Sequence, residues 1–422
     1  MNENDSERIA GILQQSGAAK VPCPEEADLI IVNTCAVRAK SEEKFYSYLG
    51  RLAKLKKKKQ VRIGVVGCVA QLRGLELLER QTFVDFVLGP DTYSRLGPLI
   101  QPTPPDKFIS AEWSEEWHDT PAHVICRENR TSGYVTVMEG CNNFCAYCIV
   151  PYTRGREKFR PLPSILEEVR DLAGKGFKEV ILLGQNVNCY RDRETQTDFP
   201  GLLQATAAVE GIEWIRFLSS HPKHLTAKIA EAMAATPKIC RQLHLPLQSG
   251  STAVLTRMNR GYTKEDYLAK VDFLRRLMPE ISLSADTIVG FPGETEAEHE
   301  ETIEALRRVR FANIFSFRYS PRPGTRASEL ADDVPFEVKR RRLEQVQQVQ
   351  KAIQLETHSR FVGRAMKVLC TGWSKKTPRL MTGRNEGSQV VNFRSSEDCS
   401  GLFVDVRVTG FGPFSLHGVR VG

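Results

Sequence analysis

The sequence lacks any run of about 18 apolar residues, which excludes a helix that crosses a membrane. Its first residues, MNENDSERIAG, are polar and acidic and lack the apolar core of a secretory signal. A cytoplasmic protein is therefore expected. With 422 residues, of which 41% are hydrophobic and 26% charged, the chain is too long for one small core, and two or three domains are expected.

Disulfide bonds are not expected either, because the cytoplasm keeps thiols reduced. The eleven cysteines are then metal ligands, redox thiols or small buried hydrophobic residues. Five of them stand alone in the sequence and are expected to be inert thiols: Cys23, Cys126, Cys240, Cys370 and Cys399.

The chain also has no excess of negative charge. Its net charge is +8, and residues 360–422 alone hold ten Lys or Arg against four Asp or Glu, a net charge of +6. A small basic segment on a nearly neutral body indicates a polyanionic partner such as nucleic acid.

The first domain is expected at residues 1–106. Strand patterns alternate there with amphipathic helix patterns, for example at residues 7–15 and 40–55, and this predicts a doubly wound, mainly parallel sheet. The Pro-rich residues 97–108 break both patterns and are expected to form a linker. The predicted strands are residues 29–33, 62–66 and 83–88.

The second domain is expected at residues 127–358, where six strand–helix units run to about residue 326 and a polar helix, 335–358, follows. Six units favour a partial (β/α)6 barrel over a complete eight-stranded one, and an open α/β sheet is the alternative. The predicted strands are residues 134–138, 179–183, 214–218, 243–247, 282–288 and 314–319, and the predicted helices include 163–173, 224–234, 264–277 and 296–309.

Residues 360–422 differ in composition, with Gly and β-branched residues in short runs such as MKVLC and QVVNF. This pattern predicts a small C-terminal antiparallel β-barrel.

The sharpest motif is EGCNNFCAYC, which places Cys141, Cys145 and Cys148 on one loop after the first strand of the barrel series. Barrel active sites form at that end of the strands. Three thiolates ligate three irons of a [4Fe–4S] cluster and leave the fourth iron open. A structural zinc loop or a chance cluster is the alternative, but zinc sites generally pair Cys-x2-Cys units or add histidine, and this loop has no histidine.

Cys-x3-Cys-x2-Cys with Tyr147 before the last cysteine resembles the signature of radical S-adenosylmethionine enzymes. The resemblance implies that the open iron chelates S-adenosylmethionine and that an electron from the cluster cleaves it to a 5′-deoxyadenosyl radical.

Two further cysteines end strands of the first domain, Cys35 in NTCAVR and Cys68 in GCVAQ. The carboxyl ends of parallel strands meet in one crevice. Two interpretations follow: the two thiols bind one ligand together, or they have independent roles. Both motifs resemble the N-terminal domain of the radical SAM methylthiotransferases. That resemblance implies an auxiliary [4Fe–4S] cluster on three cysteines.

The third family cysteine lies in a GCQMN-type motif just before the first helix, and MNENDSERIA corresponds to the residues that follow it. One interpretation is a misplaced start codon or an expressed segment begun at an internal methionine. The other is a protein that lacks this ligand, which puts the sulfur-donating half of the reaction in doubt. Cys23 is a poor substitute because it precedes its strand.

The resemblance covers nearly the whole chain, and the C-terminal segment resembles the TRAM domain, a small RNA-binding β module. The closest branch is the MiaB type, which makes 2-methylthio-N6-isopentenyladenosine beside the anticodon of tRNA with two clusters and two molecules of S-adenosylmethionine. The blocks that carry the resemblance are PYTRGRE, LLGQNVNCY, SSHP, LPLQSGS, MNRGYT, DTIVGFPGET and YSPRPGT.

Three alternatives remain open. They are the sibling branch that acts on threonylcarbamoyl-adenosine of tRNA, a radical enzyme with a small-molecule or protein substrate, and a non-enzymatic iron–sulfur RNA-binding protein. The expected partners of a methylthiotransferase are a tRNA anticodon stem-loop and an electron-donor protein, and a monomer is expected.

Five polar residues follow or end predicted strands, where the resemblance implies contacts with S-adenosylmethionine; each is equally able to bond a nearby loop. They are Gln185, Asn186, Ser219, Gln248 and Asp286. Cys189 is expected to be an ordinary thiol, and the run Lys56–Lys59 a solvated helix end. Arg154, Arg156 and Arg160 contact RNA phosphates or face solvent.

Overall fold

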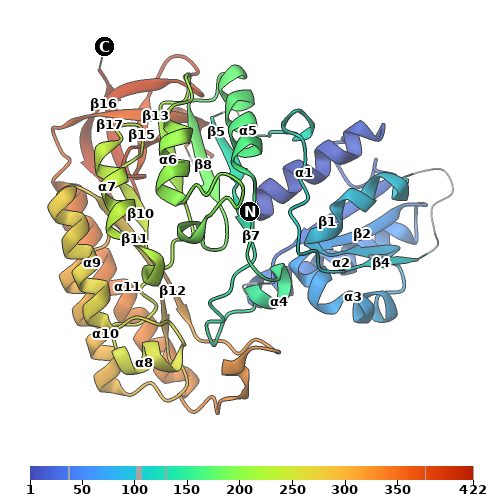
Figure 1. Cartoon of the computed structure of the whole chain (residues 1–422), viewed down its shortest axis with the longest axis horizontal. Helices are drawn as coiled ribbons and strands as arrows, with labels where there is room; N and C mark the ends of the chain where they lie inside the picture. Colours follow the sequence, from blue (N-terminus) through green and yellow to red (C-terminus); the bar gives the residue numbers. More distant parts are fainter. Residues whose placement is uncertain (37–38, 101–106, 129–130, 376, 422) are drawn as a thin grey trace. The chain divides into compact units, whose positions relative to one another are not determined.

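The computed structural model describes residues 1–36, 39–100, 107–128, 131–375 and 377–421 (Figure 1). The chain divides into two compact units. The first comprises residues 1–128, 138–144 and 148–160, and the second comprises residues 129–137, 145–147 and 161–422. Within the described ranges, no helix is both long and apolar enough to cross a membrane.

The first unit contains a four-stranded sheet in which neighbouring strands are all parallel, in the order β1-β2-β3-β4. The predicted parallel sheet is therefore confirmed. The register pairs Thr34, the last residue of β1, with Gly67, the last residue of β2. The strands are β1 (Leu29–Thr34), β2 (Arg62–Gly67), β3 (Phe86–Leu88) and β4 (Phe108–Ser110).

Helices cover both faces of this sheet, as a doubly wound fold requires. Val87 of β3 packs with α2 and α3, whereas its neighbours Phe86 and Leu88 pack with α1 and the 3₁₀ helix η1. Adjacent residues of a strand point to opposite faces, so the two helix pairs form separate layers. The helices are α1 (Asn2–Gln15), α2 (Ala39–Lys56), α3 (Cys68–Arg80) and η1 (Pro90–Ile100).

The linker predicted at residues 97–108 is only partly a linker. Its first residues belong to η1, and Phe108 begins β4, which pairs in parallel with β3. A three-residue strand is too short to produce the alternating pattern on which the prediction relied. The fourth strand lies beyond residue 106, the expected end of the domain, and residues 101–106 are outside the described ranges.

Short elements complete the first unit. Strand β6 (Met138–Glu139) pairs antiparallel with β7 (Lys158–Phe159), and helix α4 (Val150–Arg154) lies between them in sequence. A 3₁₀ turn, η2 (Ala122–Val124), precedes them.

The second unit contains two parallel three-stranded sheets, β5-β8-β9 and β10-β11-β12. A parallel bridge from Ile215 of β9 to Ile239, just before β10, links the two sheets in the order of a partial six-stranded barrel. The predicted partial (β/α)6 barrel is confirmed. Its strands are β5 (Ser132–Thr136), β8 (Glu179–Leu183), β9 (Trp214–Phe217), β10 (Gln242–His244), β11 (Ser282–Val289) and β12 (Asn313–Arg318).

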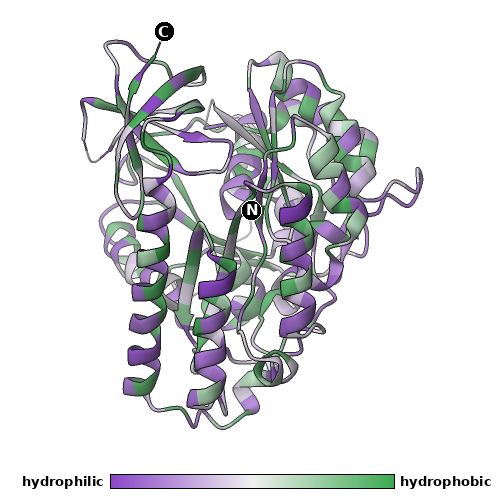
Figure 2. Cartoon of the chain, turned by 90° about the vertical axis from the view of Figure 1, so that its left-hand side faces the viewer, coloured by the Kyte–Doolittle hydropathy of each residue, from purple (hydrophilic) through white to green (hydrophobic). Residues whose placement is uncertain are grey.

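The helices of this half barrel are amphipathic (Figure 2). In α10, the buried residues Thr302, Ile303, Leu306 and Val309 recur at helical spacing. The helices are α5 (Leu162–Gly174), α6 (Phe199–Ala207), α7 (Ala227–Ala235), α8 (Thr252–Arg257), α9 (Lys264–Leu277), α10 (Glu296–Val309) and α11 (Phe336–Ser359), and the 3₁₀ turns are η3 (Val187–Cys189), η4 (Pro222–His224) and η5 (Arg326–Glu329).

The C-terminal segment forms a closed five-stranded barrel in the order β13-β14-β15-β17-β16. Four of its five strand pairings are antiparallel, as predicted, but β15 and β17 run parallel because β16 lies between them in sequence. The strands are β13 (Ala365–Trp373), β14 (Leu380–Asn385), β15 (Val390–Arg394), β16 (Phe403–Phe411) and β17 (Leu416–Arg420).

This C-terminal β-barrel contacts the amino ends of the half-barrel strands. Arg216 of β9 donates to the carbonyl oxygens of Asn385 and Glu386 at 2.8 and 2.6 Å, and to Glu179 at 2.6 Å. Trp214 packs edge-on against Phe403 with the ring centroids 4.7 Å apart. The carboxyl ends of these parallel strands lie at the opposite end of the half barrel.

Candidate functional site

The cysteine loop follows β6 and precedes α4, so it lies after the first strand of the half barrel, as the sequence predicted. Cys141 and Cys148 belong to the first unit and Cys145 to the second. Gly140 has φ +80°, and a Cβ there would lie 2.0 Å from the carbonyl oxygen of Arg156. The glycine before Cys141 is therefore required by the backbone of the loop.

Within the second unit, Cys145 is 8% exposed and is surrounded by cationic and aromatic groups. Arg260 Nη1 donates to Cys145 Sγ at 3.2 Å, and His221 Nε2 lies 3.9 Å from the same sulfur. Burial, with Arg260 nearby, lowers the pKa of His221 to about 2, so this imidazole stays neutral. Of the two basic side chains that contact Cys145 in the described part of the second unit, Arg260 is therefore the charged one.

Neighbouring backbone bonds fix the position of Cys145. The N–H of Ala146 donates to the carbonyl of Met258 at 2.8 Å, and the N–H of Ala327 donates to the carbonyl of Ala146 at 2.8 Å. Segments that are far apart in sequence thus hold the middle of the loop against the half barrel.

Cys35 and Cys68 lie side by side in the first unit. Each follows one member of the register pair Thr34 and Gly67, and adjacent strands are about 4.8 Å apart. Cys68 is also the first residue of α3, and a helix N-terminus favours negative charge. The two cysteines therefore stand at the carboxyl ends of neighbouring parallel strands, and a shared ligand stays a prediction.

The residues present fit iron–sulfur clusters in their chemistry. Three thiols within eight residues are the usual donor set of a [4Fe–4S] cluster, and the guanidinium on Cys145 suits an anionic thiolate. Cys35 and Cys68 supply two thiols for a second cluster. Over the described ranges, no three His, Cys, Asp or Glu converge as the ligands of a single metal ion.

Gln185 and Asn186 follow β8 after one glycine, so their position after the strand agrees with the prediction. Asn186 is buried, and its Nδ2 lies 2.7 Å from Cys189 Sγ and 2.9 Å from His224 Nδ1. Cys189 Sγ is itself 2.9 Å from His224 Nδ1. Cys189, expected to be an ordinary thiol, is therefore part of a polar trio at the carboxyl end of β8.

Ser219 and Gln248 follow β9 and β10 and have φ values of +68° and +66°. A positive φ outside glycine is uncommon and marks a sharp change of chain direction at a strand end. The N–H of Val187 donates to the carbonyl of Ser219 at 3.3 Å, which brings the segments after β8 and β9 together.

Asp286 differs from the prediction because it lies within β11 rather than at its end. In β11, half-buried residues alternate with buried ones, and Ser284 and Asp286 share the half-buried face. His244 of β10 joins them: its Nε2 lies 3.2 Å from Asp286 Oδ2, and its Nδ1 lies 3.0 Å from Ser284 Oγ.

Sequence reasoning missed four residues of this region, although two of them lie inside motifs that it had singled out and two lie next to such motifs. Arg260 is in MNRGYT, and His221 is in SSHP. His224 lies two residues after SSHP, and His244 directly precedes LPLQSGS. Their partners are side chains from other strands, which a single sequence does not reveal.

The arginines after the cysteine loop have two different roles. Arg154 is buried and paired with Asp5, and Arg160 is buried and paired with Asp119 at 3.0 Å. Arg156 is exposed. Contact with RNA phosphates therefore remains an interpretation only for Arg156.

The lysine run ends α2 as predicted. Lys56 bonds the carboxylate of Asp85 at 2.5 Å, and Lys59 donates to the carbonyl of Ala27 at 2.9 Å. Lys57 and Lys58 are exposed. Half of the run therefore has structural partners within the first unit.

Two of the isolated cysteines are chemically quiet. Burial raises the pKa of the Cys240 and Cys370 thiols to about 12 in each case, so both stay protonated. This agrees with the prediction that they are inert.

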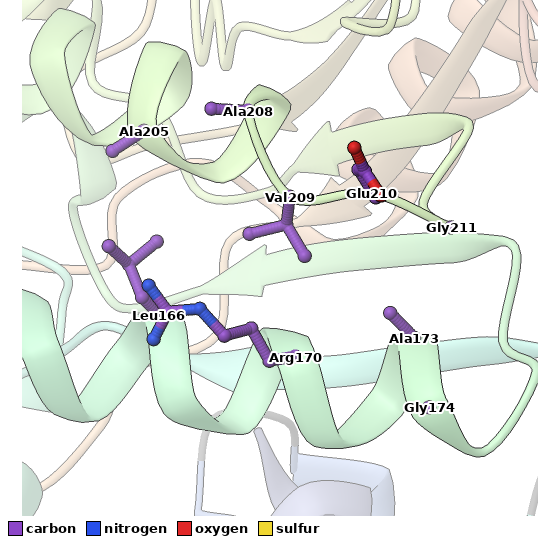
Figure 3. Close-up of a pocket in the computed structure, with 9 residues that line it drawn as sticks. All are labelled: Leu166, Arg170, Ala173, Gly174, Ala205, Ala208, Val209, Glu210 and Gly211. Atoms are coloured by element: carbon purple, nitrogen blue, oxygen red, sulfur yellow. The ribbon is translucent and has the colours of Figure 1, made fainter.

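A depression on the outer side of the half barrel is lined mainly by small and apolar residues of α5 and the end of α6 (Figure 3). Gly174 ends α5 and Gly211 precedes β9, so the depression lies toward the amino ends of β8 and β9. Arg170 and Glu210 are its charged residues. It is therefore separate from the cysteine loop and the strand-end residues.

Comparison with known proteins gives matches over both units. Residues 135–306 match the family described as the radical SAM superfamily, and residues 1–89 match the uncharacterized protein family UPF0004. The chain is 44% identical to the tRNA-2-methylthio-N(6)-dimethylallyladenosine synthase of Geobacter metallireducens, over 99% of this chain and 95% of that protein. The synthase of the same name from Syntrophotalea carbinolica is 42% identical, over 97% and 94% of the two chains.

Among solved structures, the radical S-adenosylmethionine methyltransferase TsrM from Kitasatospora setae has a similar fold. The TM-score is 0.52 at 16% sequence identity, over 76% of this chain and 66% of TsrM. At this identity the likeness concerns the arrangement of strands and helices alone.

Proposed function

The chain belongs to the family of tRNA-2-methylthio-N(6)-dimethylallyladenosine synthases, and from this premise we propose that it is a radical S-adenosylmethionine methylthiotransferase. Its substrate is N6-isopentenyladenosine beside the anticodon of tRNA, and its product is the 2-methylthio derivative. The observation that carries the proposal is the three-cysteine loop after the first half-barrel strand, in a chain whose relatives match it from end to end.

Cys141, Cys145 and Cys148 would hold the radical cluster. When bound, this cluster supplies the electron that cleaves S-adenosylmethionine to a 5′-deoxyadenosyl radical. The chain contributes a loop whose backbone at Ala146 is hydrogen-bonded to Met258 and Ala327, and a buried guanidinium beside one ligand.

Cys35 and Cys68 would hold the auxiliary cluster in the first unit. Their positions directly after two neighbouring parallel strands, with Cys68 at a helix N-terminus, support this assignment. The cluster is the proposed source of the sulfur that is transferred.

The proposed S-adenosylmethionine contacts are polar residues on or after successive strands of the half barrel. Asp286 has one carboxylate oxygen on His244, which leaves the other to accept from a ligand hydroxyl or amine. Gln248 is buried, and its Oε1 has no partner among the described residues, so a ligand donor would satisfy it. The proposed set is Gln185, Asn186, Ser219, Gln248 and Asp286.

The basic C-terminal β-barrel is the proposed contact for the tRNA anticodon stem-loop, because its net charge of +6 favours a polyanion. An electron-donor protein is a second proposed partner, since each cleavage of S-adenosylmethionine consumes one electron. A cytoplasmic monomer is the proposed working form.

The test is anaerobic reconstitution with iron and sulfide, followed by incubation with isopentenyl-tRNA, S-adenosylmethionine and a one-electron reductant such as dithionite. Mass spectrometry of the digested tRNA is expected to find the methylthio nucleoside. Cys145→Ser is expected to abolish both 5′-deoxyadenosine and product, whereas Cys68→Ser is expected to abolish product only. Cys23→Ser, which changes a thiol bonded to Glu26, is the matched control.

The alternatives predict other results. Release of 5′-deoxyadenosine without product on this tRNA, but with product on threonylcarbamoyl-tRNA, assigns the chain to the sibling reaction. Salt-dependent tRNA binding with no 5′-deoxyadenosine at all identifies a non-enzymatic RNA-binding protein.

A further inference from the structure

Arg260 occupies an unusual position for an arginine. It is 5% exposed, and its Nη1 lies 3.2 Å from the sulfur of Cys145. It follows helix α8 in the MNRGYT segment, far in sequence from the cysteine loop that it contacts. The contact is therefore created by the fold of the second unit.

Four further contacts hold the guanidinium in place. Nε donates to Tyr262 Oη at 3.2 Å, Nη1 donates to Tyr147 Oη at 3.3 Å, and Nη2 donates to the carbonyl of Pro246 at 3.4 Å. The guanidinium carbon also lies 5.3 Å from the centroid of the Tyr262 ring. A planar group held on all of its nitrogens has little freedom to turn away from the sulfur.

The charge of Arg260 has no carboxylate to balance it. In the described part of the chain, no Asp or Glu pairs with this guanidinium, whereas most buried charges in proteins are paired. Burial raises the pKa of Tyr262, so that phenol stays neutral. Of the groups that Arg260 touches, the sulfur of Cys145 is the one that becomes anionic when it ligates iron.

We infer that Arg260 is a positioning residue that raises the reduction potential of the cluster held on Cys141, Cys145 and Cys148, and so favours its reduced form. The inference rests on the proposed function, which assigns that cluster. A cation and a hydrogen bond at a ligand sulfur stabilise the electron that the cluster accepts, and these are recognised determinants of cluster potential. The electron comes from a one-electron reductant, and no bond in the protein is made or broken.

The test measures the potential directly, in the full-length chain carrying Cys35→Ser and Cys68→Ser so that only one cluster is present. Iron and sulfide are counted, and the reduced cluster is followed by electron paramagnetic resonance during a redox titration. Arg260→Gln is expected to shift the midpoint to more negative potential. A tenfold loss of reduced cluster at equal applied potential corresponds to about 59 mV for one electron.

Two further variants separate charge from structure. Tyr262→Phe removes the hydrogen bond from Arg260 Nε to the Tyr262 hydroxyl but keeps the cation, so its midpoint is expected to stay near that of the parent. Arg260→Lys keeps a cation but loses the planar guanidinium with its several donors. Its midpoint is expected to fall between the midpoints of the parent and of Arg260→Gln. If Arg260→Gln loads no iron, the midpoint potentials of the parent, Tyr262→Phe and Arg260→Lys test the inference.

Equal midpoints in the parent, Arg260→Lys and every variant that loads a full cluster would overturn the inference. The titration needs no tRNA, so it is independent of the proposed substrate. A shifted midpoint without methylthio product rejects the substrate assignment alone, and an unshifted midpoint with full product formation in the enzyme with intact Cys35 and Cys68 rejects the role of Arg260 alone.

Discussion

At the scale of single residues, the half barrel contains a hydrogen-bonded chain of Ser284, His244 and Asp286. An ionised Asp286 only accepts, so His244 Nε2 donates to it and Nδ1 accepts from the hydroxyl of Ser284. Two partners therefore fix one tautomer of the imidazole, and the imidazole in turn fixes the carboxylate.

Replacement of His244 is expected to weaken S-adenosylmethionine binding, because Asp286 loses the donor that orients it. His244→Ala is expected to raise the KM for S-adenosylmethionine about tenfold, the equivalent of one charged hydrogen bond. His244→Gln, whose amide is able to replace Nε2 as a donor, is expected to recover most of the loss.

Ser284→Ala is the matched control, because it removes the bond to Nδ1 and leaves the bond to Asp286. Kinetics of 5′-deoxyadenosine release measure all three variants. Equal KM values for His244→Ala and the parent would show that Asp286 does not depend on His244.

A second prediction at this scale concerns His299, which is buried in α10 and bonded to Gln345. Burial lowers its pKa from the usual 6.5, so the folded chain keeps the imidazole neutral while the unfolded chain protonates it. The unfolded state then binds more protons below pH 6.5, and the free energy of unfolding falls as the pH drops from 7 to 5, by at most about 1.4 kcal/mol per pH unit.

His299→Gln is expected to have a shallower pH dependence of stability in this window. Urea unfolding at pH 7.0, 6.0 and 5.0 measures the slope, and His417→Gln, which changes an exposed histidine, is the control. Identical slopes for the parent and His299→Gln would contradict the prediction.

At the scale of elements, the start of α10 is fixed by a capping box. Thr295 accepts from the N–H of Glu298, and Glu298 accepts from the N–H of Thr295. Thr295→Ala is expected to cost about 1 kcal/mol in the free energy of unfolding, because the first turn loses its cap.

Urea unfolding of the full chain measures that cost. Thr236→Ala is the matched control, since Thr236 lies at the C-terminal end of α7 and its side chain makes no hydrogen bond among the described residues. A cost for Thr236→Ala as large as that for Thr295→Ala would rule out the cap as the cause.

How well the sequence predicts each element depends on its length and pattern. Helices α9 and α10 begin and end at the residues predicted for them, and in the structure a Thr cap precedes each one. Strand β4, with three residues next to a Pro-rich stretch, was missed, and so was β14, whose sequence LMTGRN has little apolar alternation. Their pairing comes from neighbouring strands that are remote in sequence.

The candidate site was predictable to the extent that its chemistry is local. Three cysteines in eight residues signal a cluster by themselves, whereas the cation beside Cys145 comes from a segment more than 100 residues away. The strand predicted at residues 282–288 agrees with β11, Ser282–Val289, to within one residue, so Asp286 lies inside the strand and not at its end.

At the scale of the whole molecule, Arg216 joins the half barrel to the C-terminal β-barrel. Arg216→Met is expected to leave Glu179 buried without its cation and to cost about 3–5 kcal/mol in the free energy of unfolding. Protease cleavage between α11 and β13 is expected to become faster, because the C-terminal β-barrel loses its main polar contact.

Lys367→Met is the control. Lys367 pairs with Glu213 at 2.8 Å near the same contact, but both side chains are about half exposed, so its loss is expected to cost less than about 1 kcal/mol. Equal protection of Arg216→Met and Lys367→Met from protease would show that the bonds from Arg216 to Asn385 and Glu386 do not hold the C-terminal β-barrel.

The attachment of the C-terminal β-barrel at the amino ends of the strands has a consequence for the length of RNA that the protein can use. Cys145 lies beyond the opposite, carboxyl ends, and a strand of five residues such as β8 is roughly 16 Å long. If the C-terminal β-barrel binds the stem of the RNA, as proposed above, the stem must extend past that height before its loop reaches the cysteine. The second unit would thus select RNA by the distance between its paired stem and its unpaired adenosine.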